Sequence, residues 1–140
     1  MRTSKTRAWT AILFVALLGS MPAIGDDLSG ADRLLCSSVQ ATVCSIDADC
    51  EVGPPWDWNI PQFIQIDLEK KTLGTTPASG EQRVTPVTNL VREDGVIVLQ
   101  GFENGRAFSF VIHESSGQAS VAVARDGVTV SVFAACTPQQ

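Results

Sequence analysis

Four turn dipeptides, spaced ten to twelve residues apart, constrain the fold of this chain more than any other feature. They are Asp94-Gly95, Asn104-Gly105, Ser116-Gly117 and Asp126-Gly127. Asn-Gly and Asp-Gly between alternating apolar and polar residues are typical of tight β-hairpins, because a type I′ turn needs positive φ at both central positions. The sequence therefore predicts an antiparallel meander of five strands: residues 87–92, 96–102, 107–113, 119–124 and 128–135.

The residues before the meander add at least two strands. Residues 63–68 alternate between apolar and polar, as in a half-buried strand, and residues 34–43 form another candidate. The stretch 53–61 between them contains three prolines, which lack the backbone donor that a strand interior needs. Since no later window has a helical period, we expect an all-β fold of about seven or eight strands, forming a small barrel or sandwich.

The first 25 residues have the order of features of a secretory signal peptide. Basic residues precede an apolar run of eleven residues, and small residues follow up to Gly25. The run is shorter than the roughly 20 residues that cross a membrane. We therefore expect cleavage, no stable membrane insertion afterwards, and one β domain, residues 26–140, in the periplasm or outside the cell.

Removal of the signal leaves a strongly acidic chain. Seven basic residues then face fifteen acidic ones, a net charge of about −8 with histidine neutral. Nucleic-acid binding relies on clustered Lys and Arg, so we expect no nucleic-acid partner. The same charge favours a soluble monomer.

The chain contains four cysteines: Cys36, Cys44, Cys50 and Cys136. An even number in an exported chain predicts two disulfides. In a sheet closed by its first and last strands, Cys36 lies near Cys136, which leaves Cys44 to pair with Cys50. The spacings contain no C-x-x-C pair of the kind that zinc sites use, and we expect neither a metal nor a cofactor.

Two groups of residues are candidates for chemistry. The only histidine, His113, is next to Glu114, but neighbours on a strand point to opposite faces, and no G-x-S-x-G motif is present. The alternating acids Asp47, Asp49 and Glu51 lack the glycine and closing carboxylate of a calcium loop. We therefore expect no enzymatic activity; a hydrolase or lyase that uses His113 with Glu114 or Asp67 is the alternative.

The proline-rich stretch carries the candidate binding residues: Trp56, Asp57 and Trp58. Two indoles in a stiff loop can stack on a sugar or anchor a protein, because aromatic side chains give a large contact area at little entropic cost. The alternative, which we favour, is that the loop covers the open end of the sheet and the indoles fill the core. Even so, this loop is the best candidate for a binding surface.

The cysteine positions, the proline-rich loop before residues 63–67 and the ending Val132 to Thr137 are similar to those of small exported bacterial proteins of unknown function. The resemblance implies a β fold and an exported compartment, and no activity. We expect a non-enzymatic binding module for a protein partner, as in small inhibitors, or for a small ligand. A structural protein of the cell envelope is the alternative.

Overall fold

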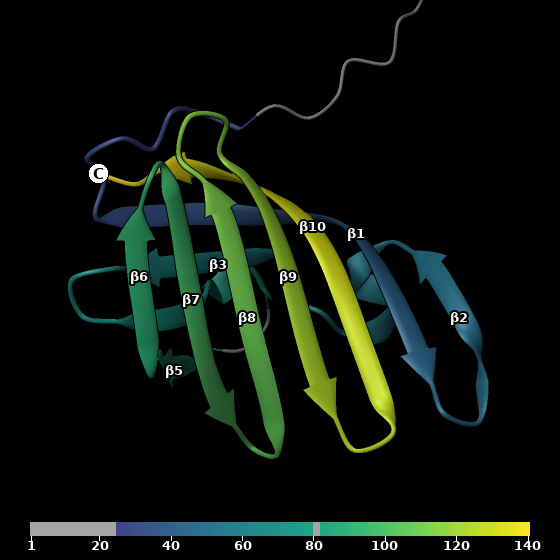
Figure 1. The fold of residues 1–140 in the computed structure, drawn as a ribbon. Coiled ribbons are helices and arrows are strands. Elements are labelled where there is room, and N and C mark those ends of the chain that lie inside the picture. The colour runs from purple at the N-terminus through teal and green to yellow at the C-terminus, as the bar shows by residue number, and fades with distance from the viewer. Residues whose placement is uncertain (1–24, 80–81) are drawn as a thin grey trace, which may run out of the picture.

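The protein is an antiparallel sheet that curls into a half-barrel (Figure 1). The computed structural model describes residues 25–79 and 82–140. Ten strands in these ranges follow the order β5-β4-β3-β1-β10-β9-β8-β7-β6, with β2 paired to β1. They are β1 (Arg33–Ser45), β2 (Ala48–Gly53), β3 (Phe63–Asp67), β4 (Thr72–Thr75), β5 (Val84–Pro86), β6 (Asn89–Glu93), β7 (Val96–Glu103), β8 (Arg106–His113), β9 (Gln118–Arg125) and β10 (Val128–Pro138). The predicted all-β class is confirmed, with more strands than expected and without full closure.

Strands β6 to β10 form the predicted five-stranded meander. At Asp94-Gly95 the φ angles are 52° and 74°, and at Asn104-Gly105 they are 50° and 74°. Positive φ at both positions is what a type I′ turn requires. The first expected strand, residues 87–92, is displaced to Asn89–Glu93, because Val87 and Thr88 connect β5 to β6.

Three strands were not expected from the sequence: β2, β4 and β5. Each has six residues or fewer, β4 contains Gly74 and β5 ends at Pro86. All three pair with a neighbouring strand, and β2 and β5 lie at edges of the sheet. Proline is tolerated in an edge strand such as β5, and in short strands pairing with a neighbour decides the conformation more than side-chain alternation does.

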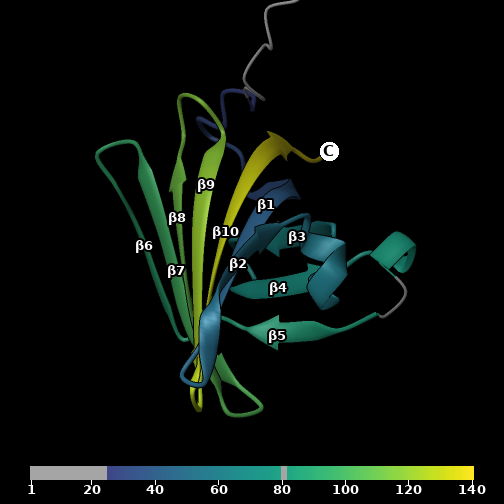
Figure 2. The same ribbon diagram turned by 90° about the vertical axis from the view of Figure 1, so that its right-hand side faces the viewer.

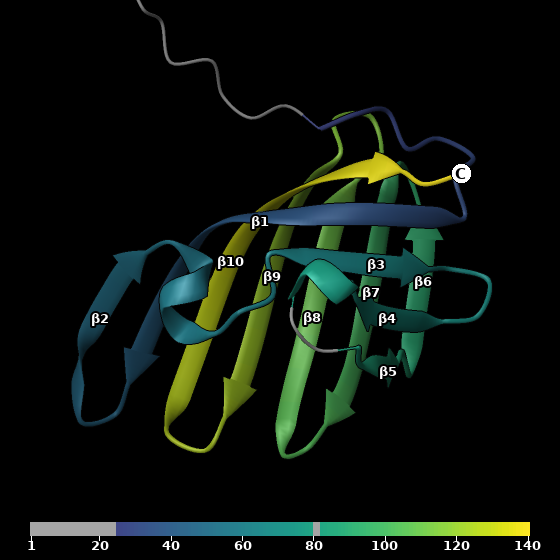
Figure 3. The same ribbon diagram turned by 180° about the vertical axis from the view of Figure 1, so that it is seen from behind.

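The long strand β1 turns the corner between the two parts of the sheet. It pairs with β10 from Leu34 to Ser45, and the register shifts between Ser38 and Gln40. On its other edge, the first half of β1 pairs with β3 and the second half with β2. Since a bulge bends a strand, β3, β4 and β5 run across the meander rather than along it, as Figure 3 shows.

Figure 2 shows the result from the side: the meander lies on one side and β3, β4 and β5 lie on the other, joined through β1 and β10. Apolar side chains from both parts fill the space near this junction. Leu28, Leu34, Ile97, Leu99 and Ile112 have no exposed surface there. Their burial supplies the main stabilisation of the fold.

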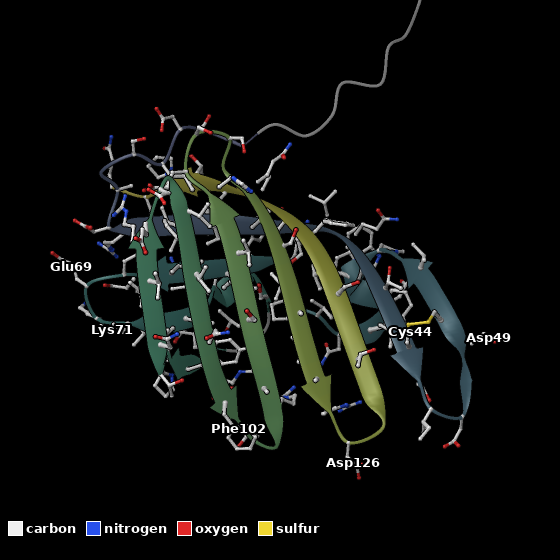
Figure 4. All side chains as sticks on the ribbon, in the orientation of Figure 1. Cys44, Asp49, Glu69, Lys71, Phe102 and Asp126 are labelled. Atoms are coloured by element: carbon white, nitrogen blue, oxygen red, sulfur yellow. A yellow bond between two sulfur atoms is a disulfide. The ribbon has the colours of Figure 1, made fainter. Side chains whose placement is uncertain are left out.

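Both predicted disulfides are confirmed. Cys36 and Cys136 occupy directly paired positions of β1 and β10 and are buried. Cys44 and Cys50 link β1 to β2 near the tip of their hairpin, where Figure 4 shows the bond beside Cys44. The central strand β1 is therefore cross-linked at two points.

The predicted signal peptide falls almost wholly in residues 1–24, which lie outside the described residues. In the described ranges, no helix is long and apolar enough to span a membrane. The two helices there are short 3-10 turns, η1 (Pro55–Trp58) and η2 (Pro77–Ser79).

Candidate binding cavity

The concave side of the half-barrel holds a cavity of about 730 Å³, open to solvent. Its walls come from the meander, from β3 and β4, and from the loop that contains η1. Six apolar side chains that pack against the core stay only partly buried and line this space: Trp58, Ile60, Ile64, Phe108, Val123 and Val130. The volume lies within the range of roughly 300 to 1,000 Å³ that is usual for small-ligand pockets.

The loop of residues 54–62 forms one wall because it bridges the bulge in β1. β2 ends at Gly53, opposite Ala41 of β1, and β3 begins at Phe63, opposite Ser37 of β1. Ser38, which is buried beside the bulge, donates its backbone N–H to the Gln62 carbonyl at 2.9 Å and its hydroxyl to the Pro61 carbonyl at 3.0 Å. These two bonds fix the end of the loop to the sheet.

The three residues predicted for binding lie together on η1, in different environments. Trp58 is half-buried and packs so close to Gly53 that a Cβ there would lie 3.0 Å from the indole Cη2. Trp56 also lines the cavity, yet 61% of its surface is exposed. Asp57 is exposed and does not line the cavity. One indole thus contacts the core and the other faces solvent at the rim.

An aromatic pair on β8 forms part of the opposite wall. Phe108 and Phe110 meet edge to face, with ring centroids 6.0 Å apart. The Phe108 ring lies directly over Gly101 of β7, where a Cβ would come within 2.3 Å of its Cζ atom and 3.0 Å of the Pro86 carbonyl oxygen. Only glycine allows the ring and β5 to approach the backbone this closely.

Three arginines also line the cavity: Arg83, Arg106 and Arg125. The Glu103 carboxylate accepts a hydrogen bond from the Thr85 hydroxyl at 2.8 Å and lies 3.7 Å from the Arg83 Nε atom. Glu103 also lies opposite Arg106 in the β7–β8 register. In residues 25–79 and 82–140, however, neither the Arg106 nor the Arg125 side chain forms an ion pair or a hydrogen bond.

The pairing of β8 with β9 places Arg106 beside Arg125. Ala107 lies opposite Ala124, so Arg106 and Arg125 occupy the next position along the two strands, and both line the cavity. Sequence reasoning missed these residues, because Arg106 follows one turn and Arg125 precedes another. Counting residues along the two strands from the turn that joins them would have shown that Arg106 and Arg125 lie at neighbouring positions.

The other candidate groups lie apart from the cavity. Glu114 is bound to Arg92, whose Nε atom donates to its carboxylate at 2.7 Å, and Asp67 accepts the Lys70 backbone N–H at 2.8 Å. No hydrogen bond joins the His113 side chain to a carboxylate within the described ranges. The acids of residues 47–51 are exposed at the β1–β2 hairpin, and no group of His, Cys, Asp or Glu in the described part is arranged to hold a metal ion.

Comparisons of this chain with protein-family models, with curated proteins and with solved structures found no match. A proposal about its function therefore depends on the cavity itself.

Proposed function

We propose that this protein binds a small apolar ligand in the cavity of the half-barrel and does not transform it. The observation that carries the proposal is a cavity of ligand size whose apolar walls stay only partly buried. Covering such walls is favourable by about 25 cal/mol for each Å² of apolar surface removed from water. A ligand would complete the core at this place.

The two disulfides support the further expectation that the protein works in an oxidising compartment, outside the cytoplasm. They also hold the cavity in one shape, because they cross-link the central strand β1 to its neighbours. A pre-formed site of this kind costs little ordering entropy when the ligand binds.

The intrinsic fluorescence of the protein offers a direct test. After residue 25 the only tryptophans are Trp56 and Trp58, and both line the cavity. We expect N-phenyl-1-naphthylamine, an uncharged apolar dye, to bind in a saturable way, gain fluorescence and accept energy from the indoles.

Adjacent positions on β9 supply a matched pair of variants. Val123 lines the cavity, whereas Ala124 is exposed on the outer face. Val123→Glu should weaken dye binding at least about tenfold by placing a charge among apolar groups, and Ala124→Glu should leave it unchanged. If Val123→Glu does not fold, Val123→Thr, which keeps the shape of the side chain, tests the same position. Absence of saturable binding by the wild type, or equal binding by all four proteins, would exclude the cavity as the site.

Trp56 favours a second candidate function, the binding of a protein partner. An indole with 61% of its surface exposed, on a loop fixed by Ser38, has the features of an interface anchor. Cross-linking in the native envelope tests this candidate. A partner captured by the wild type and lost with Trp56→Ala would support it, and a partner retained by that variant would assign the contact elsewhere.

A further inference from the structure

The charges of the cavity oppose those of the molecule as a whole. After residue 25 the chain has seven basic and fifteen acidic residues. Three of the seven basic residues line this one cavity, and Glu103 is the only acidic residue among the described residues that do so. An acidic protein therefore carries a local excess of positive charge at the place where its apolar walls are open.

Arg106 and Arg125 account for this excess. Glu103 offsets Arg83, and Arg92 elsewhere is surrounded by Glu114, Asp32 and two backbone carbonyls. Arg106 and Arg125 instead lie side by side on neighbouring strands. Glu103 also lies opposite Arg106 in the β7–β8 register, so this one carboxylate faces two of the three arginines. Three arginines against one carboxylate leave an excess of two positive charges in the cavity, which an anion between Arg106 and Arg125 would offset.

The same two strands continue from these arginines into the apolar wall. On β8 the cavity-lining side chains are Arg106, Phe108 and Phe110, and on β9 they are Arg125, Val123 and Val121. Alternate residues of a strand are about 7 Å apart, so each strand presents a cation followed by two apolar groups. The β7–β8 and β9–β10 turns beside the arginines lie at one end of the meander, where Figure 4 labels Phe102 and Asp126.

We infer that the ligand is an amphipathic anion, a molecule with an apolar body and an oxyanion headgroup such as a carboxylate. The headgroup binds between Arg106 and Arg125, and the apolar body lies along Phe108, Val123 and the residues beyond them. This inference rests on the proposed function and names its ligand class. The planar guanidinium group suits it, because its parallel N–H donors match the two oxygens of a carboxylate or a phosphate ester.

Competition with the bound dye tests the inference. Dodecanoate and dodecanol have the same chain and differ in the headgroup, and we expect dodecanoate to displace N-phenyl-1-naphthylamine at a concentration at least about tenfold lower. Arg106→Gln and Arg125→Gln should each remove most of this difference. The dye affinity of each variant is measured first, and the ratio of the two displacing concentrations is compared within that variant. Arg33→Gln removes the same charge from an exposed residue outside the cavity and should retain the difference.

Stability gives a second, independent measurement. Because the Arg125 side chain has no acidic partner among the described residues, we expect Arg125→Gln to unfold at a urea concentration no lower than that of the wild type. Arg106→Gln also removes a charge opposite Glu103, so only its response to the ligand is compared. Added dodecanoate should stabilise the wild type more than either variant, since a ligand that binds only the folded state raises its stability.

The outcomes separate this inference from the proposed function. Equal displacement by dodecanoate and dodecanol, or tighter binding of dodecylamine, would overturn the anionic headgroup and leave the apolar cavity in place. If Arg106→Gln and Arg125→Gln keep the preference for dodecanoate over dodecanol, as Arg33→Gln should, the anionic headgroup is likewise overturned and the apolar cavity stays in place. If the wild type does not bind the dye, the proposed function itself is contradicted. Tighter binding of monododecyl phosphate than of dodecanoate would support the inference, with a phosphate headgroup.

Discussion

Arg92 of β6 and Glu114, which follows β8, form an ion pair at one end of the half-barrel. The Arg92 guanidinium also donates to the backbone carbonyls of Ala31 at 3.1 Å and Leu28 at 3.3 Å, and it lies 3.5 Å from an Asp32 carboxylate oxygen. One side chain thus ties an edge strand of the sheet to the segment that precedes β1, over the fully buried Leu28.

Arg92→Gln should lower the free energy of unfolding by about 2 kcal/mol. The Glu114 side chain is only 14% exposed, and the substitution would leave its charge without a partner. Arg92→Lys should recover part of the loss, because it restores the charge but not the several directed donors. Urea unfolding measures the effect, with the exposed Arg33→Gln as control. An effect of Arg92→Gln no larger than that of Arg33→Gln would mean that this ion pair does not stabilise the fold.

The two disulfides should differ in their contribution to stability. Cys36–Cys136 joins residues 100 apart, whereas Cys44–Cys50 joins residues six apart. In the chain-entropy description, removing the long link by paired alanine substitutions lowers the free energy of unfolding by about 4 to 5 kcal/mol, and removing the short link by about 2 kcal/mol. Guanidinium unfolding of the two double variants measures this difference. The reverse order would show that local strain, not loop length, decides their effects.

Gly101→Ala should destabilise the protein by about 1 to 3 kcal/mol, because its methyl group would overlap the Phe108 ring. The same variant should weaken dye binding, since the ring must move within the cavity wall. Gly74→Ala on β4 is the matched control for stability, because the nearest atom to its new methyl group lies 3.7 Å away. Thermal unfolding compares the two; equal melting temperatures would mean that Phe108 has room to move.

The pH dependence of stability should be shallower in Asp67→Asn. The hydrogen bond from the Lys70 backbone N–H holds the pKa of the Asp67 carboxyl below its usual value. A carboxyl whose pKa is lower in the folded state contributes stability above its unfolded pKa of about 4, and this contribution is lost as the pH falls through the folded pKa. Urea midpoints measured from about pH 6 down to about pH 3 should therefore fall less in the variant than in the wild type. Lys70→Gln keeps the backbone donor and should retain most of the wild-type slope.

The two tryptophans should differ in their access to solvent. Trp56 is 61% exposed, while Trp58 is half-buried against Gly53. The variant Trp58→Phe, which leaves Trp56, should emit at longer wavelength and be quenched more strongly by acrylamide than Trp56→Phe. Equal quenching of the two variants would contradict the placement of η1 against the sheet.

The sequence predicted best those parts of the fold that local signals decide. Asp94-Gly95 and Asn104-Gly105 need positive φ, so each turn identifies its own hairpin without reference to the rest of the chain. The cysteine pairing followed from one topological assumption, that the first and last main strands are neighbours, and β1 and β10 are neighbours.

Features that depend on distant pairing could not be predicted in this way. The bulge between Ser38 and Gln40 bends β1 because of the strands on either side, and nothing in the local sequence marks it. The same is true of the arginine pair: the adjacency of Arg106 and Arg125 comes from the β8–β9 register. The sequence predicts the loop of residues 54–62 as a candidate surface, but the loop forms a wall of the cavity because Ser38 holds it across that bulge.

The order of strands also limits when the protein can fold. β10 is the last strand along the chain, yet it lies in the interior of the sheet, between β1 and β9. Contacts between residues far apart in sequence form late, because the intervening loop must first be closed. During synthesis, the halves of the sheet therefore remain separate until residues 128–138 have been made. The junction between β1 and β10, together with the Cys36–Cys136 link across it, is therefore completed last.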